Sequence, residues 1–304
     1  MNTKFPFRRR AITAIVASVF ILGACGGQGS ETADSVPASS EQSLKIVSLS
    51  PTATEMLYAI GAGDQVVAVD SLSTYPAEVA PKVTKISAYE PSAEAILAYE
   101  PDVVLISNDM NKITEQLTSA DPDIKVWTGA AAASLDDVYA QINELGALTG
   151  RVDNANEVVT SMKSRIDAAV PKSGWGIVYP VYYELDNTFY SVTSNTFVGS
   201  LLSELGMKSI ADGVEKGNDY PQLNAEAIVK ANPAIIFLAD TKCCQQTAAT
   251  VAARAGWSGI EAVKNGNVVE LDDDIASRWG PRIVDLIEQF AKAYSSAMEK
   301  AAGK

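Results

Sequence analysis

Two glutamates, Glu94 and Glu226, occupy the same place in two copies of one sequence pattern. Residues 91–106 align without a gap with residues 223–238, so the second glutamate stands 132 residues after the first. Two carboxylates can act as general acid and base in hydrolysis when they lie ~5–10 Å apart. One carboxylate on each of two lobes can instead bind two arginines of a dimeric partner, and in a first helical turn each also stabilises the helix dipole by up to ~1 kcal/mol. Catalytic, docking and structural roles therefore remain alternatives at this point.

A second candidate for chemistry is the adjacent pair Cys243 and Cys244, which follows a predicted strand over residues 235–239. Outside the cytoplasm two neighbouring thiols tend to oxidise, so we weigh a vicinal disulfide against two free thiols. The disulfide would close a strained ring, because adjacent Cα atoms lie ~3.8 Å apart and bridged cysteines rarely lie closer than ~4.4 Å. The pair has too few neighbouring ligands in the sequence to bind a metal ion on its own.

The sequence contains no histidine. This excludes a Ser-His-Asp triad, a Cys-His pair and imidazole ligation of zinc or haem iron. The sequence also has neither a nucleophile motif of the Gly-x-Ser-x-Gly type nor a phosphate-binding loop. We therefore predict a binding function, with no catalytic residue and no metal site.

Short apolar strands alternate with helices along the chain, which predicts parallel sheets with helices on both faces. In the first half, strands are predicted over residues 45–49, 66–69, 103–106 and 125–127, and helices over 50–60, 93–99 and 135–148. In the second half, strands are predicted over 175–184, 188–192, 235–239 and 268–271, with a helix over 195–205, a loop over 272–279 and a closing helix over 283–298. The predicted fold is α/β. It has two similar Rossmann-like lobes, residues 44–150 and 172–304, joined by one long helix over residues 151–171 as a clamshell.

Ligands of such sheets bind beyond the carboxyl ends of the strands. Ser50 and Thr52 follow the first predicted strand, Tyr75 lies in the loop after the second, and Tyr89 lies in the loop before the helix of Glu94. We expect these side chains at a shared edge.

The composition supports two folded lobes. With 304 residues and 47% hydrophobic content, the chain is long enough for two buried cores. Its 37 acidic and 24 basic residues give a net charge of −13, which argues against nucleic-acid binding and against adhesion to anionic lipid by charge.

The first 43 residues have the pattern of an export signal and a tether. A basic start and 14 apolar residues, too few to span a bilayer, predict a signal peptide over residues 1–24. The sequence Leu-Gly-Ala-Cys at residues 22–25 resembles the lipobox of bacterial lipoproteins, in which the cysteine, here Cys25, receives the lipid. Residues 25–43 are polar and predicted to be a disordered tether.

The chain as a whole resembles the substrate-binding lipoproteins of ABC-type importers for cobalamin and ferric siderophores. The likeness covers nearly all of residues 45–290. It rests on residues 46–51 with Thr54-Glu55, on 70–76, on both copies of the glutamate pattern, and on 280–282. It implies a clamshell anchored by lipid to the outer side of a bacterial cell membrane, with a ligand held between the lobes. It also implies that Glu94 and Glu226 contact arginines of a permease dimer.

Within that family the chain is most similar to the cobalamin branch, which implies pocket roles for Asp274 and Arg278, with Trp279 adjacent. Aromatic faces at Tyr75, Tyr89 and Trp279 suit a flat macrocycle, although isolated aromatic residues also serve in core packing. The transported ligand is then a corrinoid or an iron chelate, and no retained cofactor is expected. Alternatives are haem transport with Tyr89 as an iron ligand, and an extracytoplasmic hydrolase using paired acids. The ligand-binding candidates are Ser50, Thr52, Tyr75, Tyr89, Asp274, Arg278 and Trp279.

Overall fold

The structure, a computed structural model, describes residues 43–170 and 176–303. The predicted signal peptide, the lipidation of Cys25 and nearly all of the predicted tether lie outside the described residues. The chain from Ser43 onward forms one compact unit. Within residues 43–170 and 176–303, no helix combines the length and the apolar character needed to cross a bilayer.

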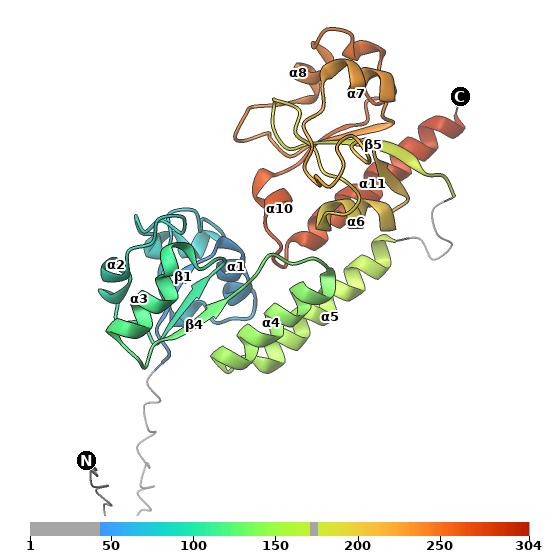
Figure 1. The fold of residues 1–304 in the computed structure, drawn as a ribbon. Coiled ribbons are helices and arrows are strands. Elements are labelled where there is room, and N and C mark those ends of the chain that lie inside the picture. Colours follow the sequence, from blue (N-terminus) through green and yellow to red (C-terminus); the bar gives the residue numbers. More distant parts are fainter. Residues whose placement is uncertain (1–42, 171–175, 304) are drawn as a thin grey trace, which may run out of the picture. The chain divides into compact units, whose positions relative to one another are not determined.

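Two four-stranded parallel sheets form the framework (Figure 1). Their strand orders are β2-β1-β3-β4 and β6-β5-β7-β8, so the second sheet repeats the topology of the first. The strands are β1 Ile46–Leu49, β2 Val66–Val69, β3 Val103–Ile106, β4 Lys125–Thr128, β5 Tyr179–Glu184, β6 Met207–Ser209, β7 Ile235–Leu238 and β8 Val268–Glu270. The predicted pair of similar α/β lobes is therefore confirmed.

Eleven α-helices are present in the described part of the chain. They are α1 Pro51–Ala59, α2 Ala93–Leu97, α3 Ile113–Ala120, α4 Leu135–Thr149, α5 Val152–Ala169, α6 Phe197–Glu204, α7 Ala225–Ala231, α8 Ala248–Ala252, α9 Glu261–Lys264, α10 Asp273–Ser277 and α11 Ile283–Ala302. Along the chain, α5 connects the first sheet to the second.

The sequence repeat is also a structural repeat. Helix α2 begins after Ser92, whose Oγ accepts the backbone N–H of Ala95 at 3.3 Å. Helix α7 begins after Asn224, whose Oδ1 accepts the backbone N–H of Ala227 at 2.8 Å. Each helix leads into a fully buried central strand, β3 in one sheet and β7 in the other.

Alternate residues of these strands face two different apolar clusters. In β3, Val104 and Ile106 belong to a cluster confined to the first lobe, and in β7 Ile236 and Leu238 belong to one confined to the second. The intervening residues of both strands belong to a third cluster, which runs through both lobes and includes side chains of α4, α5 and α11. The two lobes therefore share one continuous core.

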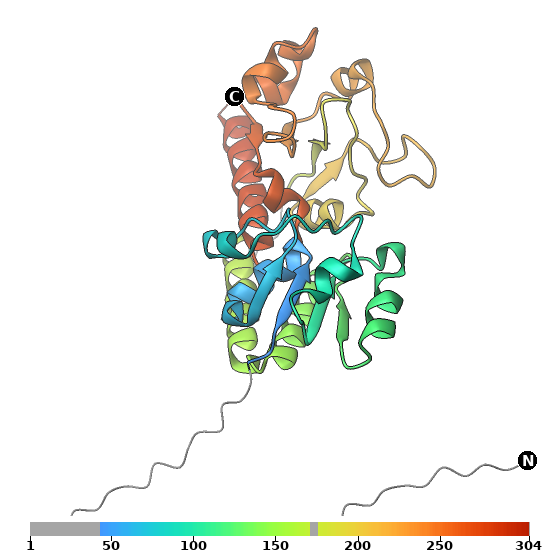
Figure 2. The ribbon, with the colours of Figure 1, turned by 90° about the vertical axis from the view of Figure 1, so that its left-hand side faces the viewer.

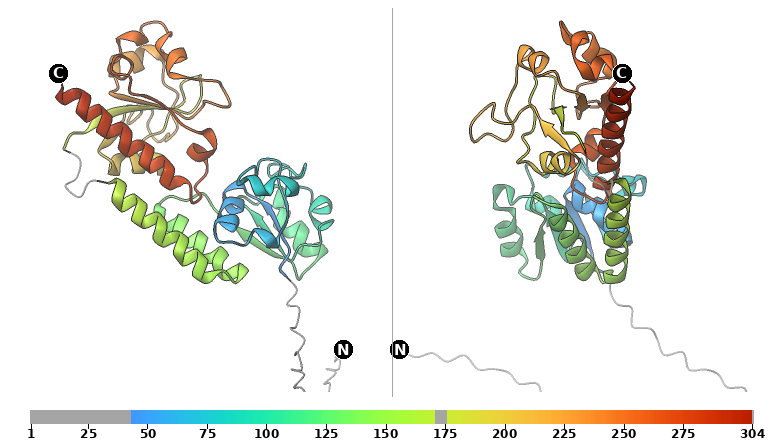
Figure 3. Two further views of the ribbon diagram at one scale, coloured as in Figure 1. Left: turned by 180° about the vertical axis from the view of Figure 1, so that it is seen from behind. Right: turned by 90° about the vertical axis from the view of Figure 1, so that its right-hand side faces the viewer.

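Helices α4, α5 and α11 lie on the same side of the two sheets (Figure 2). Figure 3 shows α5 and α11 running alongside each other, and Arg165 of α5 forms ion pairs with Asp285 and Glu288 of α11 at 2.6 and 2.8 Å. Helices α4 and α5 approach closely at Gly146, where an added Cβ would lie 2.5 Å from the Cβ of Ala155.

Two sequence predictions were wrong in the second lobe. Residues 188–192 form no strand, and Tyr190 makes only an isolated bridge to Gln222. The predicted loop over 272–279 contains α10, because Asp272 acts as its N-cap and accepts the backbone N–H groups of Asp274 and Ile275 at 2.9 and 3.4 Å.

Candidate functional site

Hydroxyl side chains gather at the carboxyl edge of the first sheet. Ser50 directly follows β1 and caps α1, accepting the backbone N–H of Ala53 at 3.2 Å. Ser107 follows β3 and donates its hydroxyl proton to Ser50 Oγ at 2.9 Å. The sheet edge thus holds these two hydroxyl groups in fixed positions next to Thr52.

A cavity of about 170 Å³ lies at this edge and brings together three of the predicted ligand-binding residues, Ser50, Thr52 and Trp279. The other lining residues are Ala53, Ser107, Asn108, Trp127, Gly129, Ala130, Ala131, Gln141 of α4 and Ser277. The Trp279 ring packs edge-on against Phe197 at a centroid distance of 5.1 Å, which fixes its orientation. Side chains from both lobes therefore meet at this cavity.

A second cavity of about 110 Å³ adjoins the first, since Ser107 and Asn108 line both. Tyr89 lines this second cavity with 67% of its surface exposed. Asp70 and Leu72, from the segment after β2, also line it. Tyr89 therefore offers an accessible aromatic ring next to a buried carboxylate.

Tyr75 lies in a different place from Tyr89. It lines a cavity of about 710 Å³, together with Tyr58 of α1, Lys82 and Arg151. The guanidinium group of Arg282 lies over the Tyr75 ring, 3.8 Å from its centroid. The structure thus does not bring Tyr75 into the cavities of Tyr89 and Trp279.

Asp274 and Arg278, predicted as pocket residues, belong to an ion-pair network that joins the lobes. Arg278 contacts Asp274 at 2.8 Å, donates to Glu55 Oε1 of α1 at 3.2 Å, and donates to the backbone carbonyl of Leu72 at 3.0 Å. Arg282 donates from Nε to Glu55 Oε2 at 2.9 Å and from Nη2 to Oε1. Both oxygens of Glu55 are therefore occupied by arginines from the other end of the chain.

This network is buried. The side chains of Glu55, Arg278 and Arg282 are 2%, 11% and 16% exposed. Burial lowers the pKa of Arg282, but the hydrogen bonds to Glu55 and the charges around Arg282, above all that of Glu55, together outweigh this effect and raise the pKa above its ordinary value. The charges thus stabilise one another in a place that water hardly reaches.

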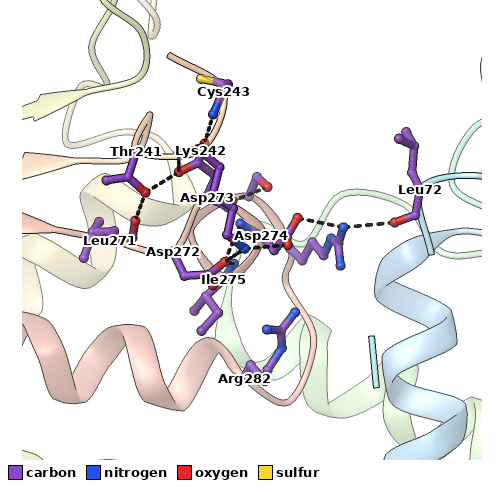
Figure 4. Close-up of polar contacts among 12 residues, drawn as sticks. Leu72, Thr241, Lys242, Cys243, Leu271, Asp272, Asp273, Asp274, Ile275 and Arg282 are labelled. Carbon is purple, nitrogen blue, oxygen red and sulfur yellow. Dashed lines mark hydrogen bonds and ion pairs between the residues drawn. The ribbon is translucent and has the colours of Figure 1, made fainter. Parts of the chain in front are cut away.

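The network continues toward the cysteine pair (Figure 4). Lys242 contacts Asp272 and Asp274 at 2.7 and 2.8 Å. Asp273 accepts the backbone N–H of Cys243 at 2.8 Å. These contacts attach the loop of residues 240–247 to the segment that carries Arg278.

Cys243 and Cys244 are free thiols in the structure, with their Sγ atoms 2.7 Å apart. The vicinal disulfide stays a prediction. No group of three or more Cys, Asp or Glu side chains in the described parts of the chain is arranged to hold a metal ion.

The carboxyl edge of the second sheet holds a buried charge cluster. Glu184, at the end of β5, receives two hydrogen bonds from Arg254, at 2.6 and 2.5 Å, and the Arg254 guanidinium lies 4.5 Å from the Trp257 ring centroid. Asp240, which follows β7, is 0% exposed, and its carboxylate oxygens have no hydrogen-bond partner among the described residues. Burial, and then the charge of Glu184, raise the pKa of Asp240 to about 7.

Glu94 and Glu226 lie in the first turns of α2 and α7. Both side chains are exposed, and neither forms a hydrogen bond or ion pair within residues 43–170 and 176–303. Figure 1 shows α2 beside the first sheet and α7 beside the second, well apart. This placement does not bring the two carboxylates together as a catalytic pair.

A family model described as periplasmic binding protein matches residues 46–275, from the start of β1 into α10. The chain belongs to the periplasmic binding protein family. Members of this family are binding proteins, as the resemblance in the sequence implied.

Relatives of this periplasmic binding protein match most of its length. An uncharacterized ABC transporter substrate-binding lipoprotein, YvrC of Bacillus subtilis, is 34% identical over 82% of this chain and 79% of its own. A cobalamin-binding protein of Halobacterium salinarum is 31% identical over 82% of this chain and 69% of its own. The crystal structure of a possible iron-binding (periplasmic solute-binding) protein of Staphylococcus epidermidis is 28% identical, with a TM-score of 0.68 over 82% of this chain and 97% of its own.

Sequence reasoning missed three buried acidic residues of this periplasmic binding protein. Glu55 was part of the family resemblance but not a site candidate, because its arginine partners lie more than 220 residues away. Asp70 and Asp240 each follow an apolar strand, and this position is the signal that could have singled them out. Their complete burial is not readable from the sequence.

Proposed function

We propose that the protein is the substrate-binding component of an ABC importer and captures a cobalamin-like or iron-chelate cargo between its two lobes. The observation that carries the proposal is the 170 Å³ cavity, which is lined by Ser50 and Thr52 of the first lobe and by Trp279 of the second. The names of the relatives, an ABC transporter substrate-binding lipoprotein, a cobalamin-binding protein and a possible iron-binding protein, support the same class of cargo. The cargo is transported and is not a resident cofactor.

The size of the cavities bears on how such a cargo would enter. Drug-sized ligands occupy pockets of ~300–1,000 Å³, whereas the two cavities at the sheet edge measure about 170 and 110 Å³. A corrinoid would therefore need the lobes to part, and would insert only its periphery into each cavity. The Arg278–Glu55 contact spans the lobes and is the contact that such a movement would change.

Light absorption by the bound cargo gives a direct test. The purified protein is incubated separately with cyanocobalamin, a ferric hydroxamate siderophore and haemin, then desalted, and its visible spectrum is recorded. Retention of cyanocobalamin or the ferric siderophore in a 1:1 ratio supports the proposal. Retention of haemin alone selects the haem alternative, with Tyr89 as its candidate ligand, and retention of none refutes the proposal.

Glu94 and Glu226 are proposed as the contacts to the permease dimer. Each is an exposed carboxylate without an internal partner, at the same place in a repeated helix, as a two-fold partner would require. The double charge reversal E94K/E226K should abolish cargo uptake by cells and leave the cargo affinity of the purified protein unchanged. A matched control is E157K/E299K, at exposed glutamates of α5 and α11. Loss of cargo affinity in E94K/E226K, or equal loss of uptake in the control, would contradict this role.

We further propose an extracytoplasmic location with a lipid anchor at Cys25. The lipobox-like sequence at residues 22–25 supports it, as does the lipoprotein name of the Bacillus subtilis relative. In a bacterial host, C25A should move the protein from the membrane fraction to a soluble one and should abolish labelling by radioactive palmitate. An unchanged distribution and unchanged labelling would refute the anchor.

A further inference from the structure

A buried carboxylate, Asp70, lies at the carboxyl end of β2 and lines the 110 Å³ cavity with Tyr89. The residue is 0% exposed. Its Oδ1 accepts the backbone N–H of Ser73 at 3.0 Å, whereas its Oδ2 has no hydrogen-bond partner among the described residues. Native proteins pair nearly all buried polar atoms, so an unpaired one calls for an explanation.

The hydroxyl groups around Asp70 are engaged with one another. Thr54 Oγ1 donates to Ser48 Oγ at 2.9 Å, and Ser48 Oγ donates to the carbonyl of Ser50 at 3.2 Å. The Thr54 hydroxyl has one proton, and it donates that proton in its hydrogen bond to Ser48. Ser73 is therefore the donor in the 3.1 Å contact between Ser73 Oγ and Thr54 Oγ1. This chain of hydroxyl groups gives no proton to Asp70 Oδ2.

The positive charge that acts on Asp70, that of Arg278, is committed to other partners. Burial raises the pKa of Asp70, against opposing contributions from Ser73 and from the charge of Arg278. Arg278, however, directs its hydrogen bonds to Glu55 and to the Leu72 carbonyl, and its ion pair to Asp274. Among the described residues, Asp70 Oδ2 is therefore a buried acceptor without a donor, on a residue that lines the cavity.

We propose that Asp70 binds a hydrogen-bond donor on the periphery of the cargo, and so selects cargo that carries amide N–H groups over cargo that carries carboxylates. The inference rests on the proposed transport function and narrows its substrate class. A corrinoid ring bears side-chain amides, whereas haem bears two propionate carboxylates, which a buried carboxylate repels. Tyr89 supplies an exposed ring next to the same cavity, against which a flat cargo can pack.

The backbone contact of Ser73 makes D70N a sharp test. In D70N the side-chain oxygen keeps the hydrogen bond from Ser73 N–H, so the amide NH₂ takes the place of Oδ2 and turns an acceptor into a donor. A charge-assisted hydrogen bond in a binding site contributes roughly a tenfold or larger factor in affinity. We expect D70N and D70A to bind cyanocobalamin at least about tenfold more weakly, and D70N to shift the cyanocobalamin-to-haemin affinity ratio toward haemin. The control is D123N, at an exposed aspartate of the same lobe that lines neither cavity.

Calorimetric titration measures these affinities, and thermal melts followed by circular dichroism confirm that each variant is folded. A folded D70N that binds cyanocobalamin as tightly as wild type overturns the proposal for Asp70 and leaves the transport function standing. Wild-type protein that retains none of the three coloured cargoes refutes the transport function itself.

A second measurement uses the unaltered protein and so does not depend on how the variants fold. Cyanocobalamin derivatives with one side-chain amide hydrolysed to a carboxylate are titrated against wild type at pH 8. At least one derivative should bind tenfold or more weakly, because its new carboxylate meets Asp70. Equal binding of every derivative, or retention of haemin alone by wild type, overturns the proposal.

Discussion

The buried ion network between the lobes allows a quantitative prediction for E55Q. The substitution keeps the shape of Glu55 but leaves two guanidinium groups, of side chains 11% and 16% exposed, facing a neutral amide. Removing one partner of a buried ion pair costs ~3–5 kcal/mol, because the remaining charge stays buried without compensation. This applies mainly to Arg282, since Arg278 keeps its ion pair with Asp274. At ~2–4 °C per kcal/mol for a chain of this size, the melting temperature should fall by ~6–20 °C.

The matched control is R165M, which breaks ion pairs that also join distant parts of the chain. The side chains of Arg165, Asp285 and Glu288 are 45%, 37% and 42% exposed, so water screens these charges. Exposed pairs contribute ~0–1 kcal/mol each. We expect R165M to lower the free energy of unfolding by far less than E55Q.

Urea unfolding followed by circular dichroism at pH 7 gives the free energy of unfolding of wild type and both variants, and thermal melts give the midpoints. A loss in E55Q no larger than the loss in R165M would refute the reasoning. It would mean that Arg278 and Arg282 bind other partners or water when glutamine replaces Glu55.

Two further predictions concern the second lobe. Because the pKa of Asp240 rises from 3.8 to about 7, folding takes up a proton between these values, so wild-type stability should fall as the pH rises through this window. D240N removes that proton uptake, so its melting temperature relative to wild type should be higher at pH 8 than at pH 4.5, and an equal difference at both pH values would contradict the raised pKa of Asp240. An added Cβ at Gly199 would lie 1.9 Å from the Thr193 carbonyl oxygen, whereas nothing lies within 4 Å of one at Gly259. In thermal melts G199A should therefore lower the midpoint strongly and G259A only slightly, and similar midpoints would show that the start of α6 adjusts at little cost.

Much of the fold could be predicted because the signal is local and occurs twice. The apolar runs of β3 and β7 and the caps Ser92 and Asn224 are short-range features, and their ungapped repetition indicates equal lobes. Elements defined by tertiary contacts could not be predicted. Strand β6 has only three residues, with an exposed lysine at its centre, and it forms because β5 offers a free edge.

The candidate site was predictable only in part, for a related reason. Position after a strand singled out Ser50 and Thr52 as candidates, and the structure places both at one cavity with Trp279. The same reasoning could not show that Tyr75 and Tyr89 line different cavities, because the path of each loop decides which cavity its tyrosine reaches. Ion pairs between residues far apart in the sequence, as at Glu55, leave no periodic pattern to read.

The apolar cluster that runs through both sheets has a consequence for how this chain can be divided. It contains Phe290 and Tyr294 of α11 together with Ile46 and Val103 of the first sheet. Neither half is a self-sufficient module, since cutting the chain near α5 would expose to water the surface that its counterpart covers. Chimaeras that exchange one half between relatives should stay insoluble unless the matching face of α11 is exchanged as well.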